Sequence, residues 1–562
     1  MILNVTASTA RPPHPHFSRS AGRSLFAAAL LAAVLIGSRG ITDEGAVSLM
    51  GDMPRYVMDG VFLYDALRSG AEWTFDGAVS YAQHYFARYP ALSLGHHPPL
   101  LPISLVPFYA ALGVSVLAAR VAVIAFFVLS VVLLYTLARR LYNQEVAGWA
   151  CLLFASSPIM APFAQAVLSE MPAIALVLAA LNALARFRDT GRLRDYILFA
   201  VAAVMSLLAR QLSVFMFPAY VALLVDRGGW SRLVRRDVIL VTLAGALPIA
   251  LIAAATLVYA PFNVAVVLEA FGRGLVASPW TSVLAPIFRG QLLPALGIVS
   301  IAGILVAIVN RDRRIMLPVY WIVAVLGGVL LVTGSVEPVR YSINVVPAYC
   351  LCAGSLACAA RTRTLRLILS AVLTVAVAGQ LWFARGTRPR SADAYEDAAR
   401  FVLGDSSRPA ATVLYSSSID TGYFVFFVRK HDPAQRLVVL RADKLLTTSL
   451  MGRLSVEDRI GSPAEIYPLL GRYGTRFIVI EDRPSGSVVI DWLRDELKGD
   501  RFIERRRIPF DEGSPLRGAS LVVYEYKDAQ SPDPDAEIDL KLPVIGREIR
   551  VPLRSLLAAE PR

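Results

Sequence analysis

Charged residues and cysteines are scarce in this chain of 562 residues. Charged side chains make up 18% of the chain and hydrophobic ones 56%, with a mean hydropathy of +0.55, which excludes an ordinary soluble domain and indicates a membrane protein. All four cysteines lie inside apolar runs without metal-ligand spacing, so neither a zinc site nor a disulfide framework is predicted: Cys151, Cys350, Cys352 and Cys358.

Lysine is absent before Lys430, so arginine supplies every permanently positive side chain of the first 400 residues. The formal net charge of +13 raises the question of a nucleic-acid partner. The basic residues are neither gathered on one domain nor interleaved with stacking aromatic residues, which argues against nucleic acid. They separate apolar runs instead, and this spacing favours a membrane topology.

About eleven apolar stretches are long enough, or nearly so, to cross a bilayer. The sequence therefore predicts a polytopic α-helical membrane domain over residues 1–384. The predicted crossings are 25–37, 121–137, 147–163, 171–185, 196–209, 212–225, 238–260, 292–309, 315–332, 343–360 and 367–383.

Six arginine clusters lie between alternate apolar stretches, and the positive-inside rule places all of them in the cytoplasm. The alternation holds only if the proline-rich stretch 98–116 does not cross, so we expect it to form a surface or re-entrant helix in the outer leaflet. The N-terminus is then cytoplasmic, and a first loop at 39–119 and a tail at 385–562 are outside the inner (plasma) membrane. A cleaved signal peptide at 25–37 is the alternative.

The tail changes composition and predicts a soluble α/β domain without a P-loop or dinucleotide fingerprint. We expect helices at 392–403 and 488–497. The expected strands lie at 412–415, 423–428, 437–440, 477–480 and 521–526.

Acidic residues in the first loop are candidates for catalysis. Asp43 and Glu44 open the loop, and Asp52-Met53-Pro54-Arg55-Tyr56 begins an amphipathic helical pattern. An acid at that place is an ordinary helix N-cap. On the outer face of the membrane it is equally suited to meet a lipid phosphate and a soluble hydroxyl group together.

Four further motifs carry polar groups to the same predicted side of the membrane. His96 and His97 precede two prolines and are candidate hydrogen-bond donors to a phosphate, whereas a metal site is less consistent with their adjacency. Glu170, in Ser-Glu-Met-Pro, is an acid where two apolar helices turn. Arg210 and the pair Arg340-Tyr341 suit a phosphate, because a guanidinium keeps its charge when desolvated.

These motifs, in this order, resemble the GT-C superfamily of membrane glycosyltransferases, in particular family 39 with its protein O-mannosyltransferase and lipid A aminoarabinose transferase branches. The resemblance covers roughly residues 25–383. It implies an inverting hexosyl- or pentosyltransferase that moves a sugar from a polyprenyl-phosphate donor to a lipid, glycan or protein hydroxyl group. Membrane lipids are implied partners, and no metal is required for a monophosphate carrier, although a divalent metal stays an open alternative.

The resemblance also implies roles for the motif residues. Asp52 would be the catalytic base, with Asp43 and Glu44 as the alternative because Met53 stands where the family often has glutamate. Glu170 would orient the acceptor or assist the base. The donor phosphate would be bound by Arg55, Tyr56, His96, His97, Arg210, Arg340 and Tyr341.

Two other classes of function stay open from the sequence. A secondary transporter would place ionisable residues near the bilayer midplane and often shows related halves, and neither feature is evident. In a non-catalytic membrane scaffold, the acids would be helix caps and the arginines would reach toward lipid headgroups.

Overall fold

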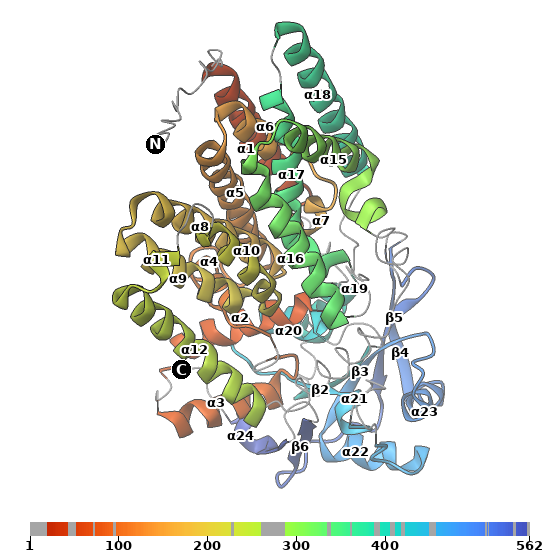
Figure 1. Ribbon diagram of the computed structural model, residues 1–562. Coiled ribbons are helices and arrows are strands. Elements are labelled where there is room, and N and C mark those ends of the chain that lie inside the picture. The colour runs from red at the N-terminus through yellow and green to blue at the C-terminus, as the bar shows by residue number, and fades with distance from the viewer. Residues whose placement is uncertain are drawn as a thin grey trace, which may run out of the picture.

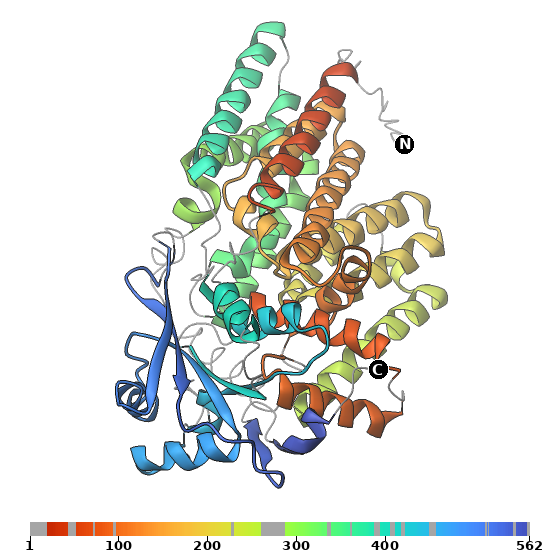
Figure 2. The ribbon, with the colours of Figure 1, turned by 180° about the vertical axis from the view of Figure 1, so that it is seen from behind.

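Helices form most of the molecule, and a mixed sheet lies at one end of it (Figures 1 and 2). The computed structural model describes residues 19–42, 52–70, 74–93, 97–225, 230–259, 287–333, 339–359, 362–386, 394–404, 411–417, 422–448, 457–511, 514, 516–542 and 547–558.

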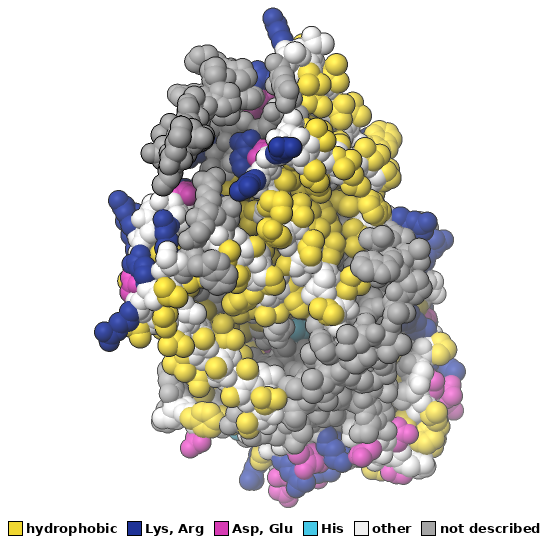
Figure 3. Space-filling model, in the orientation of Figure 1, with side chains coloured by type: hydrophobic (Ala, Val, Ile, Leu, Met, Phe, Trp, Pro, Cys, Tyr) yellow, Lys and Arg dark blue, Asp and Glu magenta, His cyan; other side chains and the backbone are white. Residues whose placement is uncertain are grey.

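Among the residues that the structure describes, six helices are long and apolar enough to cross a membrane. Figure 3 shows apolar side chains covering much of the face over α15, α16 and α18, whereas charged side chains lie mainly along its flanks and at its lower end. Many large apolar side chains are exposed, among them Leu243 and Leu251 on α12, and such a surface suits lipid rather than water. The chain is therefore an integral membrane protein. The six are α1 (Arg19–Gly37), α5 (Val116–Leu141), α8 (Glu170–Thr190), α12 (Arg236–Tyr259), α16 (Met316–Thr333) and α18 (Arg363–Gly386).

The other predicted crossings are shorter or interrupted helices, so the count of about eleven stays a prediction. The predicted span 147–163 is broken after α6 (Gln144–Ala155) and resumes as α7 (Met160–Gln165). The predicted span 343–360 consists of short helical pieces. These and the remaining pieces are α9 (Leu193–Ala209), η1 (Gln211–Met216), α10 (Phe217–Val225), α11 (Trp230–Leu233), η2 (Ile287–Leu292), α15 (Leu293–Val309), η3 (Arg313–Ile315), η4 (Val339–Val345), α17 (Val346–Gly354) and η5 (Ser355–Ala359).

Three helices fill the segment between α1 and α5: α2 (Met53–Arg68), α3 (Phe75–Arg88) and α4 (Leu100–Leu112). The amphipathic helix predicted after Asp52 is confirmed as α2. It packs closely on α4, because a Cβ atom placed on Gly60 would lie only 3.0 Å from Leu105 Cδ1. This packing fixes α2 against the helical domain.

The C-terminal part contains a five-stranded mixed sheet in the order β2-β1-β3-β5-β4, with β1, β2 and β3 parallel and β5 antiparallel to both of its neighbours. Its strands are β1 (Thr412–Ser416), β2 (Val438–Arg441), β3 (Thr475–Glu481), β4 (Phe502–Pro509) and β5 (Ser520–Tyr526). A hairpin of β6 (Glu537–Leu542) and β7 (Arg547–Pro552) follows. The helices are α19 (Ala394–Gly404), α20 (Tyr423–His431), α21 (Ala442–Leu445), η6 (Pro463–Glu465), α22 (Ile466–Arg472), α23 (Val488–Glu496) and α24 (Leu553–Leu557).

One predicted strand of the tail is wrong. Residues 423–428 form most of α20, not a strand. Their aromatic and β-branched side chains favour a strand locally, but every one of them is buried between α19, the sheet and α2, so the run has no amphipathic pattern to reveal the helix. The other four predicted strands and both predicted helices are confirmed, with small shifts at their ends.

Candidate active site

Four charged side chains from distant parts of the chain meet in one cluster. Arg340 Nη2 lies 3.0 Å from Asp52 Oδ2, and Arg340 Nε lies 3.0 Å from Glu170 Oε1. Arg210 Nη1 approaches the same Glu170 oxygen to 2.9 Å. Arg210 also donates a hydrogen bond of 2.9 Å to the backbone carbonyl of Arg340. One arginine thus bridges two carboxylates that lie 118 residues apart in the sequence.

Each member of the cluster stands at the end of an element. Asp52 directly precedes α2, and Glu170 is the first residue of α8. Arg210 lies where α9 gives way to η1, and Arg340 lies in η4. Neither Asp52 nor Ser169, at the two N-cap positions, makes a side-chain capping bond. The carboxylate of Asp52 is therefore committed to the cluster rather than to the backbone of its own helix.

His97 and Tyr56 complete one side of the cluster. His97 Nε2 lies 3.5 Å from Asp52 Oδ1, and the rings of His97 and Tyr56 stack with centroids 4.6 Å apart. Burial raises the pKa of Tyr56, so its hydroxyl group stays protonated, and its side chain is hydrogen-bonded to Ser169. Tyr56 therefore links α2 to the turn before α8.

Electrostatics keep Asp52 ionised. Burial alone would raise the pKa of Asp52, but the hydrogen bond from His97 and the charge of Arg340 together hold it well below its usual value. Glu170 is fully buried, and its Oε2 atom has no hydrogen-bond partner among the described residues. The site thus presents an ionised carboxylate beside guanidinium groups that can bind an anion.

Residues 96–266 match the family model described as dolichyl-phosphate-mannose-protein mannosyltransferase. The predicted resemblance to this glycosyltransferase family is confirmed. The matched segment contains His97, Glu170 and Arg210 of the cluster, whereas Asp52 and Arg340 lie outside it. A comparison with curated proteins found no match.

Solved structures share the fold over nearly the whole chain. ArnT from Cupriavidus metallidurans bound to undecaprenyl phosphate aligns with a TM-score of 0.58 at 14% identity, covering 91% of this chain and 99% of that one. The apo state of ArnT aligns with a TM-score of 0.54 at 14% identity, covering 92% and 100%. At this identity the likeness shows the fold alone.

The remaining residues predicted for the family site lie elsewhere or are not described. Arg55 is half-buried on α2, and its electrostatic neighbours among the described residues are Asp59 and Lys444. Tyr341 is half-buried and packs against the apolar core. Asp43, Glu44 and His96 lie outside the described residues. The structure therefore brings together six of the predicted residues: Asp52, Tyr56, His97, Glu170, Arg210 and Arg340.

Sequence reasoning missed Asp59, which lies two helical turns after Asp52 on α2. Its Oδ1 atom accepts a 2.9 Å hydrogen bond from the backbone N–H of Ser93, in the segment that leads to His97. Burial raises the pKa of Asp59 to about 7, against the Ser93 hydrogen bond and the charge of Arg55, which lower it. The sequence did contain a signal for Asp59: it follows Asp52 by seven residues, which places both acids on the same side of the predicted helix.

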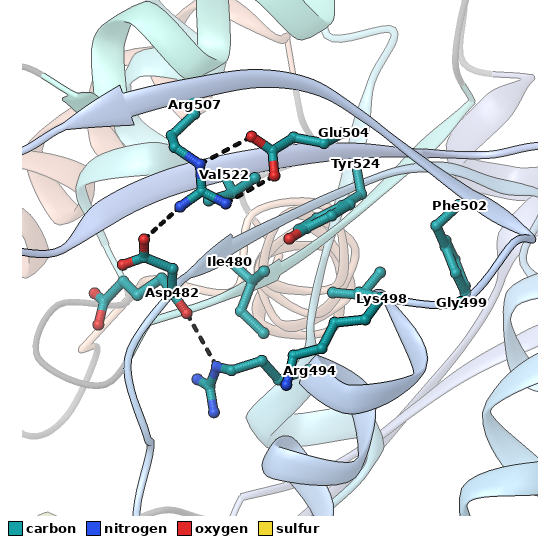
Figure 4. Close-up of a pocket in the computed structure, with 12 residues that line it drawn as sticks. Ile480, Asp482, Arg494, Lys498, Gly499, Phe502, Glu504, Arg507, Val522 and Tyr524 are labelled. Carbon is teal, nitrogen blue, oxygen red and sulfur yellow. Dashed lines mark hydrogen bonds and ion pairs between the residues drawn. The ribbon is translucent and has the colours of Figure 1, made fainter.

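A separate cavity of about 520 Å³ lies on the sheet of the C-terminal part, beside α23 (Figure 4). Its charged groups are engaged with one another. Arg507 pairs with Glu504 at 2.7 Å and with Asp482 at 2.5 Å, and Arg494 donates to the backbone carbonyl of Glu481 at 3.2 Å. No group of three or more histidine, cysteine or acidic side chains in the described ranges could hold a metal ion.

Proposed function

We propose that this chain is an inverting glycosyltransferase that moves a sugar from a polyprenyl-phosphate donor to a hydroxyl group of a lipid, glycan or protein on the extracytoplasmic face of the membrane. The bridge that Arg340 makes between Asp52 and Glu170 carries the proposal, because it sets a candidate base beside a candidate phosphate ligand. The family match and the undecaprenyl phosphate bound to the structurally similar ArnT support the class of donor.

In the proposed reaction, Asp52 accepts the proton of the acceptor hydroxyl group while that oxygen attacks the anomeric carbon of the donor sugar. The bond between the anomeric carbon and the phosphate oxygen breaks, and the electron pair leaves with the polyprenyl phosphate. Arg340 and Arg210 stabilise the charge that grows on the phosphate, with His97 as a further donor. Asp52 becomes a stronger base as the phosphate draws Arg340 away, since that pairing lowers its pKa.

Glu170 is proposed to position the two arginines rather than to accept a proton. It is fully buried, and both guanidinium groups contact it. It therefore fixes the two arginines before the donor arrives, which reduces the reorganisation needed during the reaction. The roles of Arg55 and Tyr341 as donor ligands, and of Asp43 and Glu44 as the alternative base, remain part of the proposal to be tested.

The experiment is transfer of labelled sugar from crude polyprenyl-phosphate donors to endogenous acceptors in membranes, with variants at matched expression. Asp52→Asn removes the proposed base, and Asp43→Asn removes the alternative. Asp76→Asn is the matched control, because Asp76 is an exposed acid in the first turn of α3 in the same loop. We expect Asp52→Asn alone to lower transfer by about 10² to 10⁴-fold.

Each other outcome has a defined meaning. Loss with Asp43→Asn but not with Asp52→Asn would move the base to Asp43. Full transfer with both variants would remove the acid–base mechanism and leave the transporter as the next hypothesis. Loss with Asp76→Asn as well would show a general sensitivity of the loop to lost charge.

A further inference from the structure

We propose that the C-terminal domain positions the active site, because Arg429 and Arg441 hold the two segments that carry Asp52 and His97. The inference rests on the proposed function only for the role of those two residues. We call these contacts of Arg429 and Arg441 the clamp. They depend on packing alone, so they can be tested without an activity assay.

The first attachment is a buried ion pair between Arg429 on α20 and Asp65 on α2. Arg429 Nε lies 2.8 Å from Asp65 Oδ2 and Arg429 Nη2 lies 2.6 Å from Oδ1, so the contact is bidentate. The side chains are only 8% and 5% exposed. The hydroxyl group of Tyr85 on α3 donates to Asp65 Oδ2 at 2.7 Å. Such a fork fixes direction as well as distance.

The geometry of α2 carries this attachment to the active site. Asp65 follows Asp52 by 13 residues, about 20 Å along the helix axis. A helix is a stiff element, so holding Asp65 at one end sets where Asp52 lies at the other. Arg340 meets Asp52 at 3.0 Å, and a shift of about 1 Å would break that contact.

A second set of contacts reaches His97. Arg441 at the end of β2 donates a 2.8 Å hydrogen bond to the backbone carbonyl of Pro90. Three residues further on, the N–H of Ser93 is bonded to Asp59 on α2 at 2.9 Å, and the N–H of His97 donates to the carbonyl of Ser93 at 3.3 Å. The C-terminal domain therefore holds α2 and the segment before His97 together.

A third contact joins the same parts of the molecule. Arg88, the last residue of α3, donates to the backbone carbonyls of Gln435, which follows α20, and of Leu556 on α24. Arg88 is buried, so these carbonyls take the place of water around its guanidinium group. All three attachments run from the C-terminal domain to the segment 65–90, which connects Asp52 to His97.

The test compares Arg429→Gln with Arg505→Gln. Arg505 also pairs with an acid, Glu525 at 2.5 Å, but its side chain is 45% exposed and lies on β4, the edge strand of the sheet in the same domain. Hydrogen exchange is measured over residues 53–68 of the full-length protein, and kcat and KM are measured for donor transfer. We expect Arg429→Gln to speed exchange in α2 and to lower kcat by about 10-fold to 100-fold with little change in KM. Arg505→Gln should change neither.

Two further variants keep the test decisive. Asp65→Asn combined with Arg429→Gln should lose no more than the larger single change, because both remove one pair. If Arg429→Gln is not recovered from membranes, Arg429→Lys retains the charge without the fork and is measured in the same way. Unchanged exchange in α2 and unchanged kcat in the Arg429 variant would overturn the proposal.

The two proposals fail in different ways. If Asp52→Asn leaves transfer intact while Arg429→Gln still loosens α2, the clamp is correct and the glycosyltransferase mechanism is wrong. If Asp52→Asn abolishes transfer while Arg429→Gln leaves both α2 and kcat unchanged, the mechanism stands and the clamp is wrong.

Discussion

Asp52 and Glu170 both occupy places where an acid is usually a helix cap. In the folded chain neither serves that purpose, because Arg340 contacts both carboxylates at 3.0 Å. The sequence identified both acids and the arginine as candidates, but it did not show which would meet. Contacts between residues 170 and 288 positions apart depend on how the helices pack, and no local pattern encodes them.

Glu170→Gln should destabilise the fold. The change leaves Arg210, which is 7% exposed, without its carboxylate and deprives Arg340 of one of two partners. Breaking a buried ion pair on one side costs about 3–5 kcal/mol, so we expect a clear fall in the midpoint of thermal unfolding in detergent. Glu504→Gln is the control, since its pair with Arg507 is exposed and contributes about 0–1 kcal/mol. Equal midpoints for the two variants would contradict the structural role of Glu170.

Asp59 should make stability depend on pH. Its pKa is about 7 in the folded chain against a reference value of 3.8, so the folded state keeps a proton that the unfolded state releases. This stabilisation is fully present below about pH 4 and is lost as the pH rises toward 7. Asp59→Asn keeps an oxygen for the Ser93 N–H but does not titrate. The unfolding midpoint of the variant should therefore rise relative to that of the wild type between pH 4 and pH 7. A constant difference across this range would show that Asp59 does not carry the effect.

At the scale of elements, α1 and α6 approach each other through glycines. A Cβ atom on Gly148 would lie 2.7 Å from Leu25 Cβ and 2.9 Å from the carbonyl oxygen of Gly22. A Cβ atom on Gly22 would lie 2.5 Å from the carbonyl oxygen of Gln144. Small residues allow helix backbones to come this close in a membrane.

Gly148→Ala should consequently destabilise the helix pair by about 1–3 kcal/mol, because the added methyl group meets backbone that cannot move aside. Gly379→Ala on α18 is the matched control, since nothing lies within 4 Å of its added Cβ. There the alanine should be neutral or stabilising by up to about 1 kcal/mol. Thermal unfolding of both variants in the same detergent measures the difference, and a shift of the same sign would contradict the close contact.

The elements themselves were predicted unevenly. The helix after Asp52 and, in the tail, two helices and four strands follow from local periodicity, and they form where expected. The helix α20 was expected as a strand, because its burial on all sides removes the pattern that distinguishes a helix. The strand β4 was missed because five consecutive exposed residues, including Arg505 to Arg507, leave it without an alternating apolar pattern.

For the molecule as a whole, the arginine clusters predict which end faces the cytoplasm. A single cysteine in place of Asp495, which is 71% exposed in the C-terminal domain, should react with a membrane-impermeant maleimide in intact spheroplasts. A cysteine in place of Arg194, which is 76% exposed in the first turn of α9, should react only after lysis. The native Cys151, Cys350 and Cys352 are buried, and labelling of the unaltered chain measures the background. The reverse labelling pattern would invert the topology.

By itself, the sequence determined the class of the protein and the order of its motifs. Composition, apolar length and helical periodicity are local properties, so they indicate a membrane protein, an amphipathic helix after Asp52 and a tail with strands. Only the tertiary structure decided that Arg340 joins Asp52 to Glu170, and that Arg429 joins the C-terminal domain to α2. Those contacts bring together segments hundreds of residues apart, and the packing of whole elements, rather than any residue's neighbours in the chain, selects them.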